Sequence, residues 1–296
     1  FLKELTIKNN NLNSNCFEYL LKKGINLTKL DLSYNKIKDG SEMFLANFSF
    51  SNNQLQTLNL AYNNITSVFF NSLTNNFYKN SKISKLIIKG NKLQDVNPDF
   101  ISQLFTNNCL DTFNVSDCCL SNEIIEFIFK ELTFSKIKSL DISNNKMSIK
   151  NFKNYKINSN NHLKIIKMNS CSITNDLIIE IMKILENFNS INKIDFSNNL
   201  LNDDIGILLI QKLTNFKTLI DLNIDQNRVS VQLSKNILNL IKENIKNIQG
   251  KIPNIIRQKY NKLEYEQFNI RNLLESIQTI EKEILDIEEK KKSKEI

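Results

Sequence analysis

The sequence lacks the features that mark membrane and secreted proteins. Its longest apolar runs are only a few residues long, as at 205–210, so no membrane span is predicted. No signal peptide opens the chain. The cysteines number five, an odd count that does not suit a disulfide framework. We therefore expect a reduced, cytoplasmic protein.

Residues that build cofactor and metal sites are also scarce. The five glycines are scattered and form neither a phosphate-binding loop nor a dinucleotide-binding turn. His162 is the only histidine, and no C-x-x-C pair accompanies it, so no metal site is predicted. We expect no cofactor, no small-molecule substrate, no catalytic residue and no enzymatic activity. A nucleophilic pair of His162 with a cysteine is the catalytic alternative that the sequence leaves open.

Arginine is rare although the chain is basic. The formal net charge is +8, yet only Arg228, Arg257 and Arg271 among the 39 basic residues are arginines. Lysine, asparagine and isoleucine are over-used, and they share adenine- and thymine-rich codons. We interpret the skew as drift in an AT-rich genome, such as that of a ciliate or another protist. Because the charges are also spread without blocks of one sign, we expect no nucleic-acid partner.

What the sequence does contain is a repeat. The pattern L-x-x-L-x-L-x-x-N-x-L, with other apolar residues allowed at the leucines, occurs nine times, and its copies start 25 to 28 residues apart. Such constant spacing is typical of a solenoid of stacked units. The copies are residues 2–12, 27–37, 55–65, 83–93, 110–120, 137–147, 163–173, 191–201 and 219–229.

Each part of the repeat has a predicted structural role. The alternating L-x-L centre predicts a short strand with one buried face. At the ninth position the chain turns inward, and a small polar side chain there can bond to backbone groups that would otherwise lack partners. We therefore expect a ladder of ninth-position residues that ties each coil to the next. Its members are Asn10, Asn35, Asn63, Asn91, Cys118, Asn145, Cys171, Asn199 and Asn227.

Segments with helical spacing lie between the strands. Residues 121–134, 174–188 and 202–216 are predicted helices, with acidic residues in their first turns. The predicted N-caps are Ser121, Thr174 and Asn202. Cys118 and Cys119 are adjacent, so one is expected to point inward and the other outward.

A unit of strand, loop, helix and return loop at this length resembles the leucine-rich repeat family. Its ribonuclease-inhibitor-like subclass is the most similar, since it accepts asparagine or cysteine at the ninth position. The resemblance implies an α/β solenoid, a horseshoe with parallel strands inside and helices outside. We expect this domain to cover residues 1–235, without an N-terminal cap, because the chain begins inside a repeat.

The C-terminal part of the chain departs from the repeat. Residues 231–249 are predicted to form a last, longer helix, and residues 236–253 are assigned as capping helix and linker. Residues 254–296 are predicted to form a helix with short coiled-coil-like heptads. It either docks against a partner helix, which we favour because its apolar stripe is narrow, or packs on the solenoid itself. The stripe consists of Ile270, Leu273, Ile277, Ile280, Ile284 and Ile287.

The strand residues that point away from the core are predicted to form the inner wall of the solenoid, and this wall is the candidate protein-binding surface. It mixes lysines with aspartates and offers two large aromatic side chains, the residue type that usually dominates binding energy. The predicted binding residues are Lys29, Asp31, Tyr34, Asn59, Tyr62, Lys85, Lys89, Asp141, Lys167, Lys193, Asp195 and Asp221.

These observations favour a non-enzymatic scaffold for protein–protein interaction within a larger assembly. The chain is similar to leucine-rich subunits of ciliary axonemes, such as that of the nexin–dynein regulatory complex, which implies a role in the cilium, the axoneme or another cytoskeletal assembly. One alternative is a GTPase-activating protein for Ran, built on the same repeat subclass. That activity depends on an arginine near the N-terminal repeats, whereas the first arginine here is Arg228. A ubiquitin-ligase substrate adaptor is the other alternative.

Overall fold

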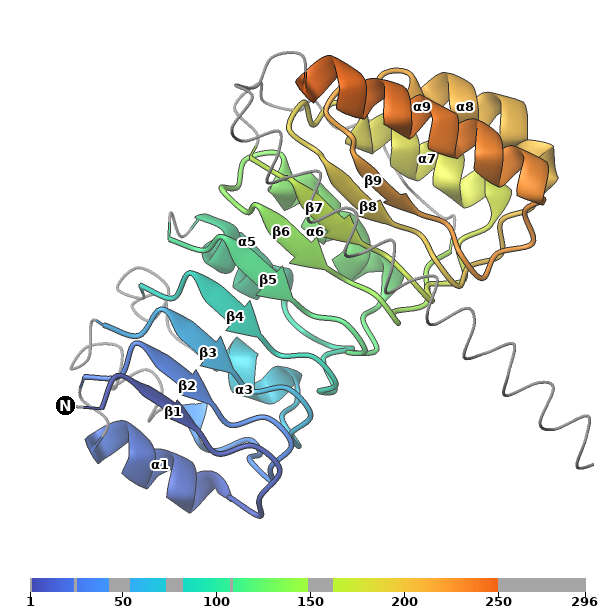
Figure 1. Ribbon diagram of the computed structural model, residues 1–296. Helices are drawn as coiled ribbons and strands as arrows, with labels where there is room; N and C mark the ends of the chain where they lie inside the picture. The colour runs from blue at the N-terminus through green and yellow to red at the C-terminus, as the bar shows by residue number, and fades with distance from the viewer. Residues whose placement is uncertain are drawn as a thin grey trace, which may run out of the picture. The chain divides into compact units, whose positions relative to one another are not determined.

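The computed structural model describes residues 2–23, 26–42, 54–72, 82–106, 109–148 and 162–249 (Figure 1). The chain divides into two compact units, residues 1–244 and 245–296. Of the second unit, only the last residues of one helix are described, so the fold below is that of the first unit.

Within the described residues, nine strands of three residues each form one parallel sheet. Their order in space, β1 to β9, is their order in the sequence, so every strand pairs with the strand of the next repeat. The strands are β1 (Glu4–Thr6), β2 (Lys29–Asp31), β3 (Thr57–Asn59), β4 (Lys85–Ile87), β5 (Thr112–Asn114), β6 (Ser139–Asp141), β7 (Ile165–Lys167), β8 (Lys193–Asp195) and β9 (Asp221–Asn223).

The pairing register follows the sequence repeat. Leu30 of β2 pairs with Leu58 of β3, which pairs with Leu86 of β4. These central residues are buried on one face, as are those of β5 to β8. The residues on either side of each centre point to the other face, because side chains alternate along a strand. The sequence-based prediction of one half-buried strand per repeat is confirmed.

Helices cover the buried face of the sheet (Figure 1). The ring of Phe105 in α5 lies 5.9 Å from that of Phe113 in β5, and the ring of Phe70 in α3 lies 5.0 Å from that of Phe100 in α5. The predicted α/β repeat solenoid is therefore confirmed, with its core between sheet and helices. The helices are α1 (Ser14–Lys23), α3 (Ser67–Asn71), α5 (Pro98–Thr106), α6 (Asn122–Leu132), α7 (Asn175–Leu185), the 3-10 helix η1 (Asp203–Ile205), α8 (Gly206–Leu213) and α9 (Val231–Gln249).

The predicted N-caps are present. The Ser121 hydroxyl accepts a hydrogen bond from the third following backbone N–H in α6, and Thr174 does the same in α7. Asn202 instead caps the second following N–H, that of Asp204. This tighter turn explains why the helix expected over 202–216 begins as the 3-10 helix η1 before α8. The helices α6, α7 and α8 also end two or three residues before the predicted ends.

The predicted ladder of ninth-position residues is present from Asn35 onward, and Asn145 shows how it works. The prediction was wrong for Asn10, which is exposed and donates to the Lys8 carbonyl of its own repeat. Asn145 is fully buried. Its Nδ2 donates to the carbonyls of Val115, 3.0 Å away in the preceding repeat, and Ile142, 2.9 Å away in its own. Its Oδ1 accepts from the backbone N–H groups of Cys118 and Leu120. One side chain thus joins two coils with hydrogen bonds in both directions.

Cysteine occupies the ninth position in two of the repeats, at Cys118 and Cys171. The Cys118 thiol donates to the carbonyls of Ile88 and Ser116, and Cys171 bonds in the same way. A thiol offers no strong acceptor, so the N–H of Leu93, which elsewhere in the ladder would meet an asparagine oxygen, donates to the backbone carbonyl of Cys118 at 2.9 Å. The backbone therefore compensates for the missing acceptor.

The last described helix matches its predicted span of residues 231–249. Leu233, Ile237 and Ile241 on one face of α9 are buried. Asn244 Nδ2 donates to the carbonyls of Phe216 and Leu219, 2.9 and 3.1 Å away where the ninth repeat begins. In the part of the chain that the structure describes, no helix is long and apolar enough to cross a membrane.

Candidate protein-binding surface

All of the predicted wall residues lie on the open face of the sheet or directly after its strands, and none of them is buried. Most of them belong to the strands, on the face that none of the described helices covers. Tyr34, Tyr62 and Lys89 follow strands β2, β3 and β4. The structure thus brings the predicted residues onto one continuous surface, although it also gives several of them a structural role.

The acidic and amide residues at the strand ends brace the turn that follows. Asp31 Oδ1 accepts hydrogen bonds from the backbone N–H of Ser33 at 3.0 Å and from its hydroxyl at 2.7 Å. Asp195 holds Ser197 in the same way. Asn59 donates to the other oxygen of Asp31 at 3.0 Å, across neighbouring strands. This structural role was not predicted, although the recurring D-x-S spacing could have revealed it.

Two of the predicted lysines are paired with acids on adjacent strands. Lys29 lies 3.2 Å from Glu4, and Lys193 pairs with Asp221. Exposed ion pairs of this kind contribute about 0–1 kcal/mol to stability. These side chains are therefore less available to a partner than the sequence suggested.

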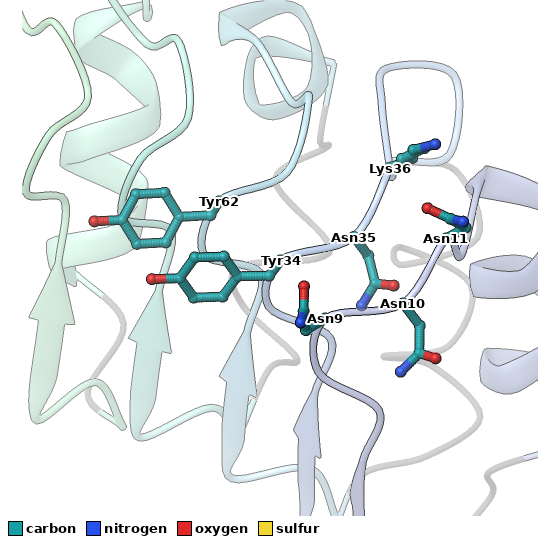
Figure 2. Close-up of a pocket in the computed structure, with 7 residues that line it drawn as sticks. All are labelled: Asn9, Asn10, Asn11, Tyr34, Asn35, Lys36 and Tyr62. Atoms are coloured by element: carbon teal, nitrogen blue, oxygen red, sulfur yellow. The ribbon is translucent and has the colours of Figure 1, made fainter.

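Tyr34 and Tyr62 form a stacked pair at the carboxyl-terminal ends of β2 and β3. Their ring centroids are 4.5 Å apart with an interplanar angle of 27°. Figure 2 shows the rings face to face, with their hydroxyl groups pointing the same way. The Nζ of Lys8 lies 5.0 Å from the Tyr34 centroid, and that of Lys89 lies 5.6 Å from the Tyr62 centroid. We call these four residues the tyrosine site.

The two tyrosines have a backbone conformation that disfavours bulky side chains. Their φ angles are +58° and +52°, in the left-handed region. This region suits glycine, asparagine and aspartate, and a bulky residue there is strained. The other repeats have small or polar residues at the same position. These are Asn9, Gly90, Asp117, Asn144, Ser170, Asn198 and Gln226.

Gly90 makes room for the ring of Tyr62. It has a φ of +70°, and a Cβ added to it would lie 2.3 Å from Tyr62 Cδ1. No side chain can occupy that space while the ring stays in place. The glycine of the fourth repeat and the tyrosine of the third therefore depend on each other.

A pocket of about 460 Å³ lies beside the tyrosines, where the first repeats turn away from the sheet (Figure 2). Its asparagines are not all available to a ligand, because the Nδ2 of Asn35 is engaged with the carbonyls of Ile7 and Leu32. The lining residues are Asn9, Asn10, Asn11, Tyr34, Asn35, Lys36 and Tyr62.

The pKa of Lys89 is raised above its ordinary value. Desolvation by partial burial lowers the pKa, but hydrogen bonding and Coulombic attraction to Tyr62, with the charges of Asp141 and Asp117, outweigh it. The ammonium group therefore stays protonated at physiological pH beside the Tyr62 ring.

The described cysteines divide by burial. Desolvation raises the pKa of the Cys118 thiol to about 12 and that of Cys171 to about 12. A thiol that is protonated at neutral pH is a poor nucleophile. Cys119 is exposed, so the prediction that Cys118 and Cys119 point in opposite directions is confirmed.

Among the described residues, no group of three or more His, Cys, Asp or Glu side chains could hold a metal ion.

The predicted heptad residues from Ile270 to Ile287 lie outside the described residues. Their role as a docking helix, and the assignment of residues 254–296, stay predictions.

Comparison with known proteins agrees with this geometry. The family model described as Leucine Rich Repeat matches residues 26–49 and 54–76. The chain contains leucine-rich repeats. A stretch of 141 residues also aligns with NACHT, LRR and PYD domains-containing protein 4C of Mus musculus at 27% identity. The alignment covers 46% of this chain and 14% of that protein.

The fold has a counterpart among solved structures. A chain in the crystal structure of the mouse RP105/MD-1 complex aligns with a TM-score of 0.54 and 23% identity, over 79% of this chain and 36% of that one. At this identity the likeness shows the fold alone. The aligned region is well under half the length of either relative.

Proposed function

We propose that this leucine-rich repeat chain is a non-enzymatic scaffold that binds other proteins through the open face of its sheet. The observation that carries the proposal is the tyrosine site, two stacked aromatic rings flanked by lysines on an otherwise polar face. Aromatic side chains contribute a large share of binding energy at protein interfaces. Leucine-rich repeat proteins typically bind proteins, which supports the same proposal.

The scaffold is suited to binding because its surface is rigid. Buried ninth-position residues join successive coils, and strand-end residues such as Asp31 hold the turns on the open face. A surface that is ordered before binding loses less conformational entropy when a partner arrives.

Affinity purification from native extract tests the proposal. The tagged full chain is compared with an open-face variant, Lys85→Glu with Lys167→Glu, and with a helix-side variant of the same charge change, Lys130→Glu with Lys235→Glu. All four lysines lie in the described part of the chain and none is buried. Loss of co-purified proteins only in the open-face variant is expected. Loss only in the helix-side variant would place binding on the helices and reject the proposal.

The narrower proposal is a structural subunit of a ciliary, axonemal or other cytoskeletal assembly. Its support is the resemblance of the repeats and composition to such subunits, together with the resemblance to the ribonuclease-inhibitor-like subclass, which is itself part of this proposal. It predicts that the tagged protein enters cilia as they form and stays with the detergent-resistant axoneme. A protein that remained in the cell body of ciliated cells would contradict it.

Docking through residues 254–296 is a separate part of the proposal. Truncation after Gly250 is expected to remove the partners that the heptad stripe binds and to leave those of the open face. Retention of every partner would reject the docking helix.

The alternative function, GTPase activation of Ran, requires an arginine near the N-terminal repeats. In the described residues, arginine occurs only at position 228.

A further inference from the structure

We propose that the tyrosine site, formed by Lys8, Tyr34, Tyr62 and Lys89, binds an extended acidic segment of a partner protein. This inference rests on the proposed function and names the chemistry of the partner. It places the centre of binding at the carboxyl-terminal edge of β1 to β4 rather than in the middle of the sheet.

The groups that the site presents are positive or donating. Stacking hides the facing sides of the two rings, and Lys8 lies over the other side of Tyr34. What remains toward solvent are ring edges, which carry partial positive charge, and two hydroxyl groups (Figure 2). Lysine ammonium groups flank both rings. Carboxylates match this arrangement, because they accept hydrogen bonds from hydroxyl and ammonium groups and are drawn to ring edges.

Acids near the site are already engaged. Both oxygens of Asp31 accept hydrogen bonds within the sheet. Glu4 is paired with Lys29. Asp31 keeps its negative charge, because its hydrogen-bond donors are neutral. The three lysines Lys8, Lys85 and Lys89 outnumber it on this half of the face, although Asp117 and Asp141 reduce the field at Lys89 from the next repeats. Charge complementarity favours an acidic segment over a basic one.

The strained backbone supports a binding role. Tyrosine occupies two left-handed positions in adjacent repeats, where other repeats have asparagine, as at Asn144 and Asn198. Strain that a simple substitution would relieve is typical of functional sites. The Tyr62 ring also requires a glycine beside it, at Gly90. The stacked pair therefore depends on three residues in three successive repeats, Tyr34, Tyr62 and Gly90.

Peptide selection with the full chain tests the inference. A phage-displayed library of random dodecapeptides is selected on the wild-type chain and on Tyr34→Asn with Tyr62→Asn. Asparagine is chosen because the chain itself uses it at this backbone position, so the variant is expected to fold. Tyr19→Asn, an exposed tyrosine on α1 that is 63% accessible, is the matched control.

The wild-type chain and the Tyr19 control are expected to enrich peptides rich in aspartate and glutamate. For one enriched peptide, measured by fluorescence anisotropy, the double tyrosine variant is expected to bind at least tenfold more weakly. Lys8→Gln with Lys89→Gln is expected to weaken binding and flatten its salt dependence. A second matched pair, Lys130→Gln with Lys235→Gln on the exposed side of helices α6 and α9, is expected to bind as the wild type does.

Three results would overturn the inference: enrichment of basic or apolar peptides, no enrichment at all, or equal affinity for the wild type and the tyrosine variant. These results are separable from failure of the proposed function. If the open-face variant loses its co-purified proteins while the tyrosine variant keeps full peptide affinity, the scaffold binds proteins through another part of the face.

Discussion

Replacing Asn145 with alanine should destabilise the solenoid severely. The substitution leaves the backbone N–H groups of Cys118 and Leu120 without their acceptor, and it removes the donor from the carbonyls of Val115 and Ile142. Each buried group left unsatisfied costs about 1–3 kcal/mol. The two N–H groups alone therefore predict a loss of about 2–6 kcal/mol. A domain is typically stable by about 5–15 kcal/mol, so this is a large fraction.

The chain supplies its own controls. Asn10 has the same repeat position but is exposed and donates only to the Lys8 carbonyl, so Asn10→Ala should change stability by less than about 0.5 kcal/mol. Asn145→Cys imitates the natural solution at Cys118 and Cys171, in which a backbone carbonyl replaces the side-chain acceptor. It should cost less than Asn145→Ala.

The assay is urea unfolding followed by circular dichroism, with hydrogen exchange at the Leu120 amide as a local readout. Repeat arrays can unfold in parts, so the exchange rate reports on the ladder even where the global transition is not two-state. If Asn145→Ala and Asn10→Ala destabilise equally, or if the Leu120 amide stays as protected as in the wild type, the ladder does not hold the coils together and the reasoning is wrong.

Three further predictions concern the tyrosine site and the thiols. Tyr34→Asn with Tyr62→Asn should unfold within about 1 kcal/mol of the wild type in urea, since relief of left-handed strain offsets lost stacking of about 0.5–1.5 kcal/mol; a much larger loss would show that the tyrosines are structural. Gly90→Ala should lower the free energy of unfolding by more than about 1 kcal/mol, the general cost of an alanine at a positive φ. It should also lower the affinity for the selected acidic peptide, because the new Cβ displaces the Tyr62 ring; unchanged affinity would contradict this. The raised pKa values of Cys118 and Cys171, each about 12, mean that their contribution to stability is complete below about pH 8.5, the unfolded thiol pKa, and is lost as pH rises toward 12. Urea unfolding at pH 7.5 and 9.5 should therefore show a smaller pH-dependent loss in a variant with alanine at both positions; equal losses would refute this.

The sequence allowed the repeat architecture to be predicted because each repeat position has a single local task. A leucine between two polar residues forms a half-buried strand, and serine or threonine before a helix caps it, whatever the distant parts of the chain do. The period then sets the register, as in the pairing of Leu30 with Leu58. Even the cysteines of the ladder could be interpreted, since Cys118 is small enough to be buried where asparagine usually lies.

The candidate site was predicted only in part, because its geometry depends on side chains in different repeats. Tyr34 and Tyr62 were recognised as aromatic residues, but their stacking depends on a parallel register combined with left-handed backbone. The role of Gly90 depends on where a ring points, which no local pattern encodes. Lys8 was missed, although it shares its repeat position with Lys89 and could have been found by aligning the repeats.

The most direct test of binding through the open face is site-specific photo-crosslinking in the native cell. The photoreactive residue p-benzoylphenylalanine is placed in the full chain at Lys85, on strand β4 of the open face, or at Lys130, on helix α6. Both lysines are exposed, so neither substitution should disturb the core. The account predicts discrete crosslinked partner proteins from position 85 and none from position 130. Crosslinks from position 130 alone would contradict it.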